Sequence, residues 1–276
     1  MSSSSTRVDR LNKTCPLRER DVKRRAQMPQ SQNRLLNVLP QNIFTAVERE
    51  LKPVGVEFGT AVARVGQPVE RVYFPHCGVI SLVIEMQDGG MIETATVGWD
   101  GVVNGTSALD GKISLHKSIV QVSGTASAIL PHVLKKLADE FEPLRDILIR
   151  HDQVLFAQAQ QSAGCNASHR VEERMCRWLL RIRDLTGSDE LNLTQEYLAH
   201  MLGVRRSSVS LIAGTLQRAG FIKYRRGRIR LLDIEQLQAG ACECYQAVRS
   251  HYERLLMVRD GDQSRLHLNK NHVGSY

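Results

Sequence analysis

Apolar residues recur at helical spacing in a short segment that begins at Thr194 and ends at Gly203. Threonine is a preferred N-cap, and the acidic Glu196 would lie in the first turn of such a helix. Gly203 supplies the left-handed residue with which many helices end. The apolar stripe has i, i+1, i+4, i+5 spacing and consists of Tyr197, Leu198, Met201 and Leu202. The pattern predicts a short amphipathic helix.

A second amphipathic helix is predicted directly after the first, opening at Arg205 and ending at Gly220. Its inward-facing residues follow helical spacing: Val209, Ile212, Ala213, Leu216 and Ala219. Residues 221–224 and 228–232 then alternate around Arg226-Gly227, which is typical of a hairpin. Two short helices around a glycine-containing turn are the signature of a helix-turn-helix, and the hairpin would be its wing.

The N-terminal half has a different pattern. Residues 53–130 contain short apolar and β-branched runs separated by glycines, which is typical of a β-sandwich or barrel. Asp88-Gly89-Gly90 lies between two such runs and favours a hairpin turn. We therefore expect an α+β protein, with an N-terminal β jelly roll followed by helices.

A long helix is predicted from Ala138 to about Gln161, because its one proline, Pro143, lies near the start, where a first turn tolerates it. Its stripe has three-four spacing and includes Leu144, Leu148, His151, Leu155 and Gln158. Such a stripe is typical of the seam between two helices of a dimer, although burial against the helix's own domain would give the same pattern. At the seam, His151 would be either a pH-sensitive contact or a hydrogen-bonded structural residue. Residues 162–168 break the pattern and are the predicted hinge, with Ser168 capping the next helix.

The distribution of positive charge along the chain indicates a candidate function. Between Gly203 and Leu232 there are eight arginines and lysines and no carboxylate, and the whole chain has a formal net charge of +8. Charges of one sign within a folded segment repel one another, so a polyanionic partner would explain why they are kept together. The alternative is a basic face that is simply exposed to solvent. Arg206 is the candidate base reader, because arginine pairs bidentately with guanine. We expect contacts with double-stranded DNA from Thr194, Gln195, Arg205, Arg206, Ser207, Ser208, Ser210, Arg225, Arg226 and Arg228.

These motifs resemble those of the Crp/Fnr family of bacterial transcription regulators. The resemblance covers about residues 35–235 and is most specific in residues 193–209 and in Gly220-Phe221-Ile222. It implies a homodimer with an N-terminal effector-sensing domain like that which binds cyclic nucleotides, a long dimerisation helix and a C-terminal winged helix-turn-helix. It also implies a palindromic operator, with the second helix in the major groove. RNA polymerase is a further partner in the case of activation.

The sequence departs from the family in the phosphate cassette, which is the segment that holds the ligand in members that bind cyclic nucleotides. Where nucleotide-binding members carry a glutamate for the ribose and an arginine for the phosphate, residues 101–106 and 115–118 contain neither. A lysine point charge does not replace a guanidinium fork. We therefore expect another small-molecule effector, or none, with a cyclic-nucleotide-responsive regulator as the alternative. The candidate effector pocket consists of Asn104, Gly105, Thr106, His116 and Lys117.

Cysteine and histidine positions argue against a cofactor. An iron–sulfur sensor of this family needs closely spaced N-terminal cysteines, and Cys15 stands there alone. Cys242 and Cys244 lie in a predicted helix from Ile234 to about Met257, where residues two apart point to different faces, so we expect no metal site. A metal-dependent jelly-roll enzyme would need paired histidines and a carboxylate, and no H-x-H pair is present. The sequence therefore predicts neither enzyme activity nor a cofactor.

The predicted organisation has five parts: a disordered basic tail (1–30), an effector-sensing jelly roll (31–135), a dimerisation helix (136–164), a winged helix-turn-helix (165–235) and a C-terminal helix and tail (236–276). No apolar run is long enough to span a membrane, and residues 1–6 lack the apolar core of a secretion signal. Together with cysteines scattered as in reduced proteins, this predicts a cytoplasmic protein.

Overall fold

The computed structural model describes residues 31–87, 89–109 and 113–257, so the predicted N-terminal tail and the end of the C-terminal segment lie outside the described residues. The N-terminal half contains η2 (Leu36–Val38), α3 (Gln41–Glu50), β1 (Lys52–Val56), β2 (Ala61–Ala63), β3 (Val72–Glu85), β4 (Met91–Val97), η3 (Thr106–Ala108) and β5 (Lys117–Ile129). The remainder contains α4 (Pro131–Glu140), α5 (Glu142–Ser168), α6 (Val171–Thr186), β6 (Glu190–Asn192), α7 (Gln195–Leu202), α8 (Arg206–Arg218), β7 (Ile222–Arg225), β8 (Arg228–Leu231), α9 (Ile234–Ala239) and α10 (Cys244–Met257).

The N-terminal strands form one antiparallel sheet in the order β1-β5-β3-β4, with β2 also paired to β5. The two long strands, β3 and β5, shift register at several bulges, and bulges bend and twist a sheet. A Cβ at Gly124 would lie 2.0 Å from the carbonyl oxygen of Cys77, so glycine allows the two backbones to approach here. The hairpin predicted between β3 and β4 is confirmed, with Gly89 at φ +82°.

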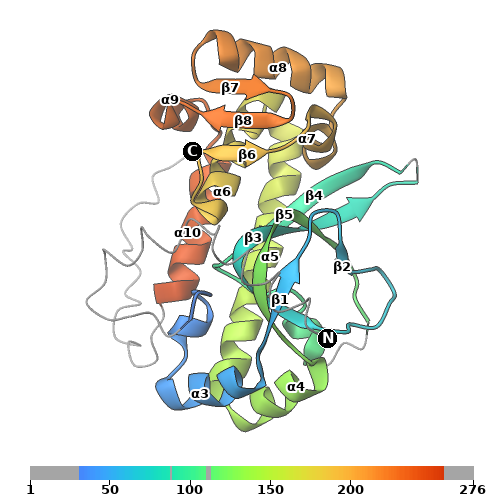
Figure 1. The fold of residues 1–276 in the computed structure, drawn as a ribbon, viewed down its shortest axis with the longest axis vertical. Coiled ribbons are helices and arrows are strands. Elements are labelled where there is room, and N and C mark those ends of the chain that lie inside the picture. The colour runs from blue at the N-terminus through green and yellow to red at the C-terminus, as the bar shows by residue number, and fades with distance from the viewer. Residues whose placement is uncertain (1–30, 88, 110–112, 258–276) are drawn as a thin grey trace, which may run out of the picture.

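Apolar cores cover both sides of the sheet. On one side, Phe44 of α3, Leu134 of α4 and Leu144 of α5 are buried together with Phe74 of β3. A second core joins β3 to α6 and to the helix-turn-helix elements, so the sheet and the C-terminal domain share buried side chains. Figure 1 shows α5 running along the molecule, with α3 and α4 at one end and α8 at the other. The expected α+β architecture is confirmed.

Three local predictions were wrong. The helix expected from Ala138 is two helices, because α4 ends before the extended residue Phe141 and α5 begins with Pro143 in its first turn. The expected hinge at 162–168 is helical, since Ser162 and Cys165 face buried surroundings and packing overrides the low helix propensity of that run. The chain turns at His169 and Arg170, and Arg170 rather than Ser168 is the N-cap of α6.

The predicted C-terminal helix is also interrupted. It forms α9 and α10, separated by residues 240–243. α10 packs along α5 and also contacts α6, so the segment after the wing returns to the centre of the molecule. Within the described part of the chain, no helix combines the length and apolarity needed to cross a membrane.

Candidate nucleic-acid interface

The helix-turn-helix consists of α7 and α8. Thr194 is the N-cap of α7, as predicted, and its Oγ1 accepts a hydrogen bond of 3.1 Å from the backbone N–H of Tyr197. Gly203 ends α7 at φ +62°, also as predicted. Leu198 of α7 and Leu216 of α8 are buried in the core that holds the two helices together. The local signals of cap, stripe and glycine therefore placed both helices correctly.

The N-terminal end of α8 carries exposed positive charge. Arg205 is its N-cap and Arg206 its first residue, and both side chains are exposed. Among the described residues, no carboxylate pairs with either guanidinium. The helix N-terminus adds a partial positive charge to the same place. Charge that the protein leaves unpaired at a helix N-terminus suits a phosphate backbone or a guanine edge.

Other predicted DNA contacts surround this end of α8. Ser207 and Ser210 are exposed, while Ser208 and Gln195 are half-buried. The Ser210 hydroxyl donates to Gln195 Oε1 at 2.6 Å and so links α8 to the first residue of α7. Leu211 is 69% exposed on α8, four residues after Ser207 and therefore on the same face.

The wing is the β7–β8 hairpin, to which β6 adds a third strand. Its two-residue turn has positive φ at both Arg226 (+48°) and Gly227 (+77°), the pattern of a type I′ turn. The Gln217 side chain accepts a 2.7 Å hydrogen bond from the backbone N–H of Tyr224, which fixes the wing against α8. Arg225, Arg226 and Arg228 are exposed, and no described carboxylate pairs with them.

Comparison with known proteins agrees with this geometry. Residues 173–239 match the family model of the Crp-like helix-turn-helix domain. This segment is a Crp-like helix-turn-helix domain. It includes most of α6 and all elements from β6 to α9, and therefore both helices and the wing described above. A comparison with curated proteins finds no match.

Solved structures resemble a larger part of the chain. A protein described as a transcriptional regulator of the crp/fnr family from Eubacterium rectale is 17% identical, covers 75% of this chain and 96% of its own, and has a TM-score of 0.60. FixK2 from Bradyrhizobium japonicum is 16% identical over 70% of this chain and 98% of its own, also with a TM-score of 0.60. The c-di-GMP responsive global regulator CLP of Xanthomonas campestris is 16% identical over 70% and 100%, with a TM-score of 0.57. The Crp-like domain is therefore attached to an N-terminal half with the fold of these regulators.

The predicted effector residues are brought together only in part. Asn104, Gly105, Thr106 and His116 line one small cavity of about 10 Å³, together with His151 of α5. Lys117 instead forms an ion pair of 2.8 Å with Glu85. A cavity of this volume holds about one water molecule. Among the described residues of this region, the cavity is therefore too small for a nucleotide.

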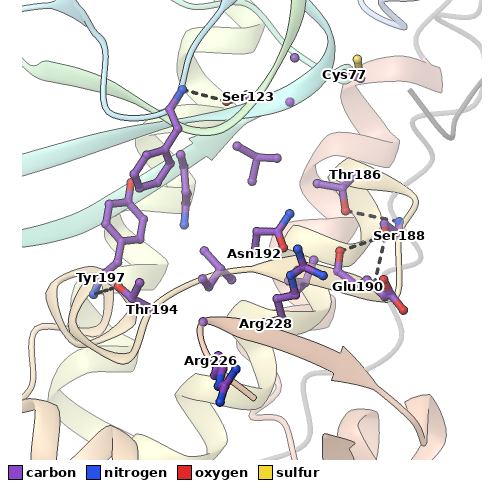
Figure 2. Close-up of a pocket in the computed structure, with 18 residues that line it drawn as sticks. Cys77, Ser123, Thr186, Ser188, Glu190, Asn192, Thr194, Tyr197, Arg226 and Arg228 are labelled. Carbon is purple, nitrogen blue, oxygen red and sulfur yellow. Dashed lines mark hydrogen bonds between the residues drawn. The ribbon is translucent and has the colours of Figure 1, made fainter. Parts of the chain in front are cut away.

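A larger cleft of about 640 Å³ lies between the N-terminal sheet and the Crp-like domain. Its walls include Phe58 and Ser123 from the sheet domain and Tyr197, Arg226 and Arg228 from the helix-turn-helix and wing (Figure 2). The rings of Phe58 and Tyr197 are in contact across it, with centroids 5.1 Å apart. Sequence reasoning missed this cleft because its walls come from distant segments that share no local motif.

The predicted dimer stripe has a different role in the structure. Leu144, Leu148, His151 and Gln158 are buried within their own chain, and Leu155 is half-buried. The four buried side chains are therefore not available as the seam with a second helix. The sequence could not distinguish the two cases, because both require the same three-four spacing.

His151 and Gln158 of α5 belong to a buried polar network with the sheet domain and α10. The His151 Nε2 atom accepts a hydrogen bond from the backbone N–H of Val102 at 3.3 Å, and burial lowers the pKa of His151 to about 4. Gln158 donates to Thr96 Oγ1 at 3.1 Å and accepts from the Tyr252 hydroxyl at 3.2 Å. His151 is therefore a neutral, hydrogen-bonded residue, as in the second of its two predicted roles.

Proposed function

We propose that this protein is a cytoplasmic transcription regulator that binds a palindromic operator as a homodimer. The observation that carries the proposal is the exposed positive charge on two neighbouring elements. Arg205 and Arg206 open α8, Arg225, Arg226 and Arg228 form the wing, and none has a described carboxylate partner. A helix N-terminus and a basic hairpin on a Crp-like domain suit the major groove and the adjacent phosphates.

The base contacts follow from the exposed face of α8. Arg206 would pair with guanine, and Ser207 and Ser210 would contact bases or phosphates. Leu211 has no hydrogen-bonding group, so its exposed side chain would contact a thymine methyl group. Thr194 and Gln195, at the start of α7, would contact the phosphate backbone.

The dimer interface would use the outer face of α5. Ile149 and Phe156 are 41% and 65% exposed, lie seven residues apart and are followed after seven more by Ala163, which is also exposed. A seven-residue apolar repeat on an otherwise unpartnered helix face suits a second copy of the same helix. Two-fold symmetry would also place the helix-turn-helix of each subunit on one half of the operator.

The effector site would be the 640 Å³ cleft rather than the cassette cavity, because small-molecule sites are typically a few hundred cubic ångströms. A ligand there would touch both the sheet and the wing, and its anionic groups would meet Arg226 and Arg228 (Figure 2). Binding would change the position of the wing relative to the sheet and so couple effector to DNA. In an activator, the DNA-bound dimer would also contact RNA polymerase.

Fluorescence anisotropy tests the central proposal. The full-length protein is titrated with duplex DNA from upstream of its own gene and with a random duplex, with and without cyclic AMP. We expect promoter-selective binding that weakens steeply with salt and does not respond to the nucleotide. Alanine variants of the interface arginines are compared with Arg64→Ala, which removes an exposed arginine from the sheet domain. Equal, salt-insensitive binding to both duplexes would overturn the proposal.

A further inference from the structure

Four side chains that can bind a metal ion lie close together where the end of α5 meets the start of α10. They are Cys165 in the last turn of α5, His169 directly after it, Cys242 in the connection between α9 and α10, and Cys244, the first residue of α10. One ligand atom from each residue lies within 4.8 Å of all the others. The three cysteines are at most 6% exposed, and His169 is partly exposed.

Two features of the fold bring these residues together. Because α5 stays helical to Ser168, Cys165 and His169 are separated by one helical turn and lie on the same face. Because α9 ends at Ala239, Cys242 lies in the connection and Cys244 begins α10. The prediction that Cys242 and Cys244 point to different faces requires one continuous helix. The structure interrupts that helix before Cys244, so this argument against a metal site does not apply.

The distances favour a single ion. Cys165 Sγ and Cys242 Sγ are 3.5 Å apart, and Cys244 Sγ is 3.5 Å from His169 Nδ1. In a tetrahedral site with zinc–sulfur bonds of about 2.3 Å, neighbouring sulfurs are about 3.8 Å apart. An iron–sulfur cluster distributes its ligands over two or more irons and needs wider spacing than these four atoms have.

The surrounding groups also suit a metal site. His169 Nε2 is 3.1 Å from Glu243 Oε1, so the ring offers Nδ1 to the cluster while a carboxylate holds its other nitrogen. Gln161 Nε2 donates to Cys244 Sγ at 3.0 Å, and the positive Arg177 interacts electrostatically with Cys165 and Cys242. Sulfur ligands of protein metal sites commonly accept such hydrogen bonds from neighbouring side chains.

We propose that Cys165, His169, Cys242 and Cys244 bind one tetrahedral zinc ion. Three thiolates and one imidazole complete the coordination, so the site is closed and structural rather than catalytic. The ion connects the end of α5 to the start of α10. Arg174 of α6 interacts with Cys165 and Cys242 and donates a hydrogen bond to the carbonyl oxygen of Leu202, at the end of α7. The ion therefore lies near an arginine of α6 that contacts the end of α7.

The test is metal analysis of the full-length protein, purified under reducing conditions without chelator. We expect one zinc per chain. Replacement of the zinc by Co²⁺ should give the intense visible bands of tetrahedral cobalt bound to thiolates. The Cys242→Ser and Cys244→Ser variants should lose the stoichiometric metal. Cys77→Ser, which changes a buried cysteine in β3, should retain it.

A milder variant covers the case in which a cysteine variant does not fold. Glu243→Gln should keep the four ligands and weaken zinc binding by about 10–100-fold in a chelator competition, because the carboxylate orients His169. Metal-free wild-type protein that gives no tetrahedral cobalt spectrum would overturn the proposal. So would a Cys165–Cys242 disulfide found by mass spectrometry in the reduced preparation, or unchanged zinc affinity in Glu243→Gln.

Discussion

Arg181 Nη1 of α6 lies 2.9 Å from Asp100 Oδ2, in the loop after β4, and this ion pair joins the Crp-like domain to the N-terminal sheet. Both side chains are nearly buried, at 13% and 7% exposed. The Tyr252 ring of α10 lies over the guanidinium, 4.5 Å from ring centroid to Cζ. Three segments far apart in the sequence therefore meet at one buried charge pair.

Loss of one partner should be costly. Asp100→Ala leaves the Arg181 charge buried without its carboxylate, and we expect the free energy of unfolding to fall by about 3–5 kcal/mol in urea denaturation. The control is Glu253→Ala, which breaks the exposed pair with Arg249 and should cost less than about 1 kcal/mol. Similar losses in the two variants would show that the Asp100–Arg181 pair is not an important link.

His151 should make stability depend on pH. Its pKa is lowered to about 4 by burial, with Asp100 opposing and Arg181 reinforcing the shift, while the unfolded residue titrates near 6.5. Between these values the unfolded state binds more protons, so the contribution is complete above about pH 6.5 and falls as pH decreases toward 4. The slope should be about one kcal/mol per pH unit. Tyr252, which is also in contact with His151, stays neutral throughout this window, since burial raises its pKa.

The measurement is the free energy of unfolding from pH 4 to 7 in the wild type and in His151→Gln. Glu93 acts in the opposite direction, because burial raises its pKa to about 7, and His76 acts in the same direction. The difference between the two proteins removes both contributions. The variant should lose the His151 slope, whereas His132→Gln, at an exposed histidine, should keep it.

Arg206 and Arg228 should differ in what they contribute to DNA binding. Arg206→Ala should cost about 1–3 kcal/mol on the operator and relax preference at one base pair, because it removes a base contact. Arg228→Ala should weaken binding to every duplex and reduce the salt slope by about one, because it removes a phosphate contact. Anisotropy over a series of single-base operator variants and salt concentrations separates the two effects. An Arg206→Ala loss that is equal on all sequences would assign Arg206 to the backbone.

Phe156 should determine the oligomeric state. It is 65% exposed on α5, so Phe156→Glu should not disturb the core but should place a charge in the proposed interface. We expect the dimer measured by analytical ultracentrifugation to become a monomer and operator affinity to fall. Leu115→Glu, at another exposed apolar residue, is the control and should remain dimeric. A dimer that survives Phe156→Glu would exclude this face of α5.

The amino-acid sequence by itself determined the elements that depend on neighbouring residues. The cap Thr194, the terminating Gly203 and the Arg226-Gly227 turn are local signals, since their backbone conformations and hydrogen bonds involve residues close in sequence. The concentration of positive charge is equally visible, because it is composition. The helix-turn-helix, the wing and most of the predicted DNA-binding surface could therefore be derived before the structure.

The tertiary structure decided which face of each element meets which partner. Leu144 and Leu148 are buried within the chain while Phe156 is exposed, although the stripe alone fits both a core and a dimer seam. Cys165 and Cys242 are adjacent only because α5 continues and the helix after the wing is interrupted. Helical periodicity shows that several apolar side chains share one face of a helix. Which residues that face contacts depends on long-range packing. The proposed zinc site, the inter-domain cleft and the Arg181–Asp100 pair all depend on such contacts, and no local pattern records them.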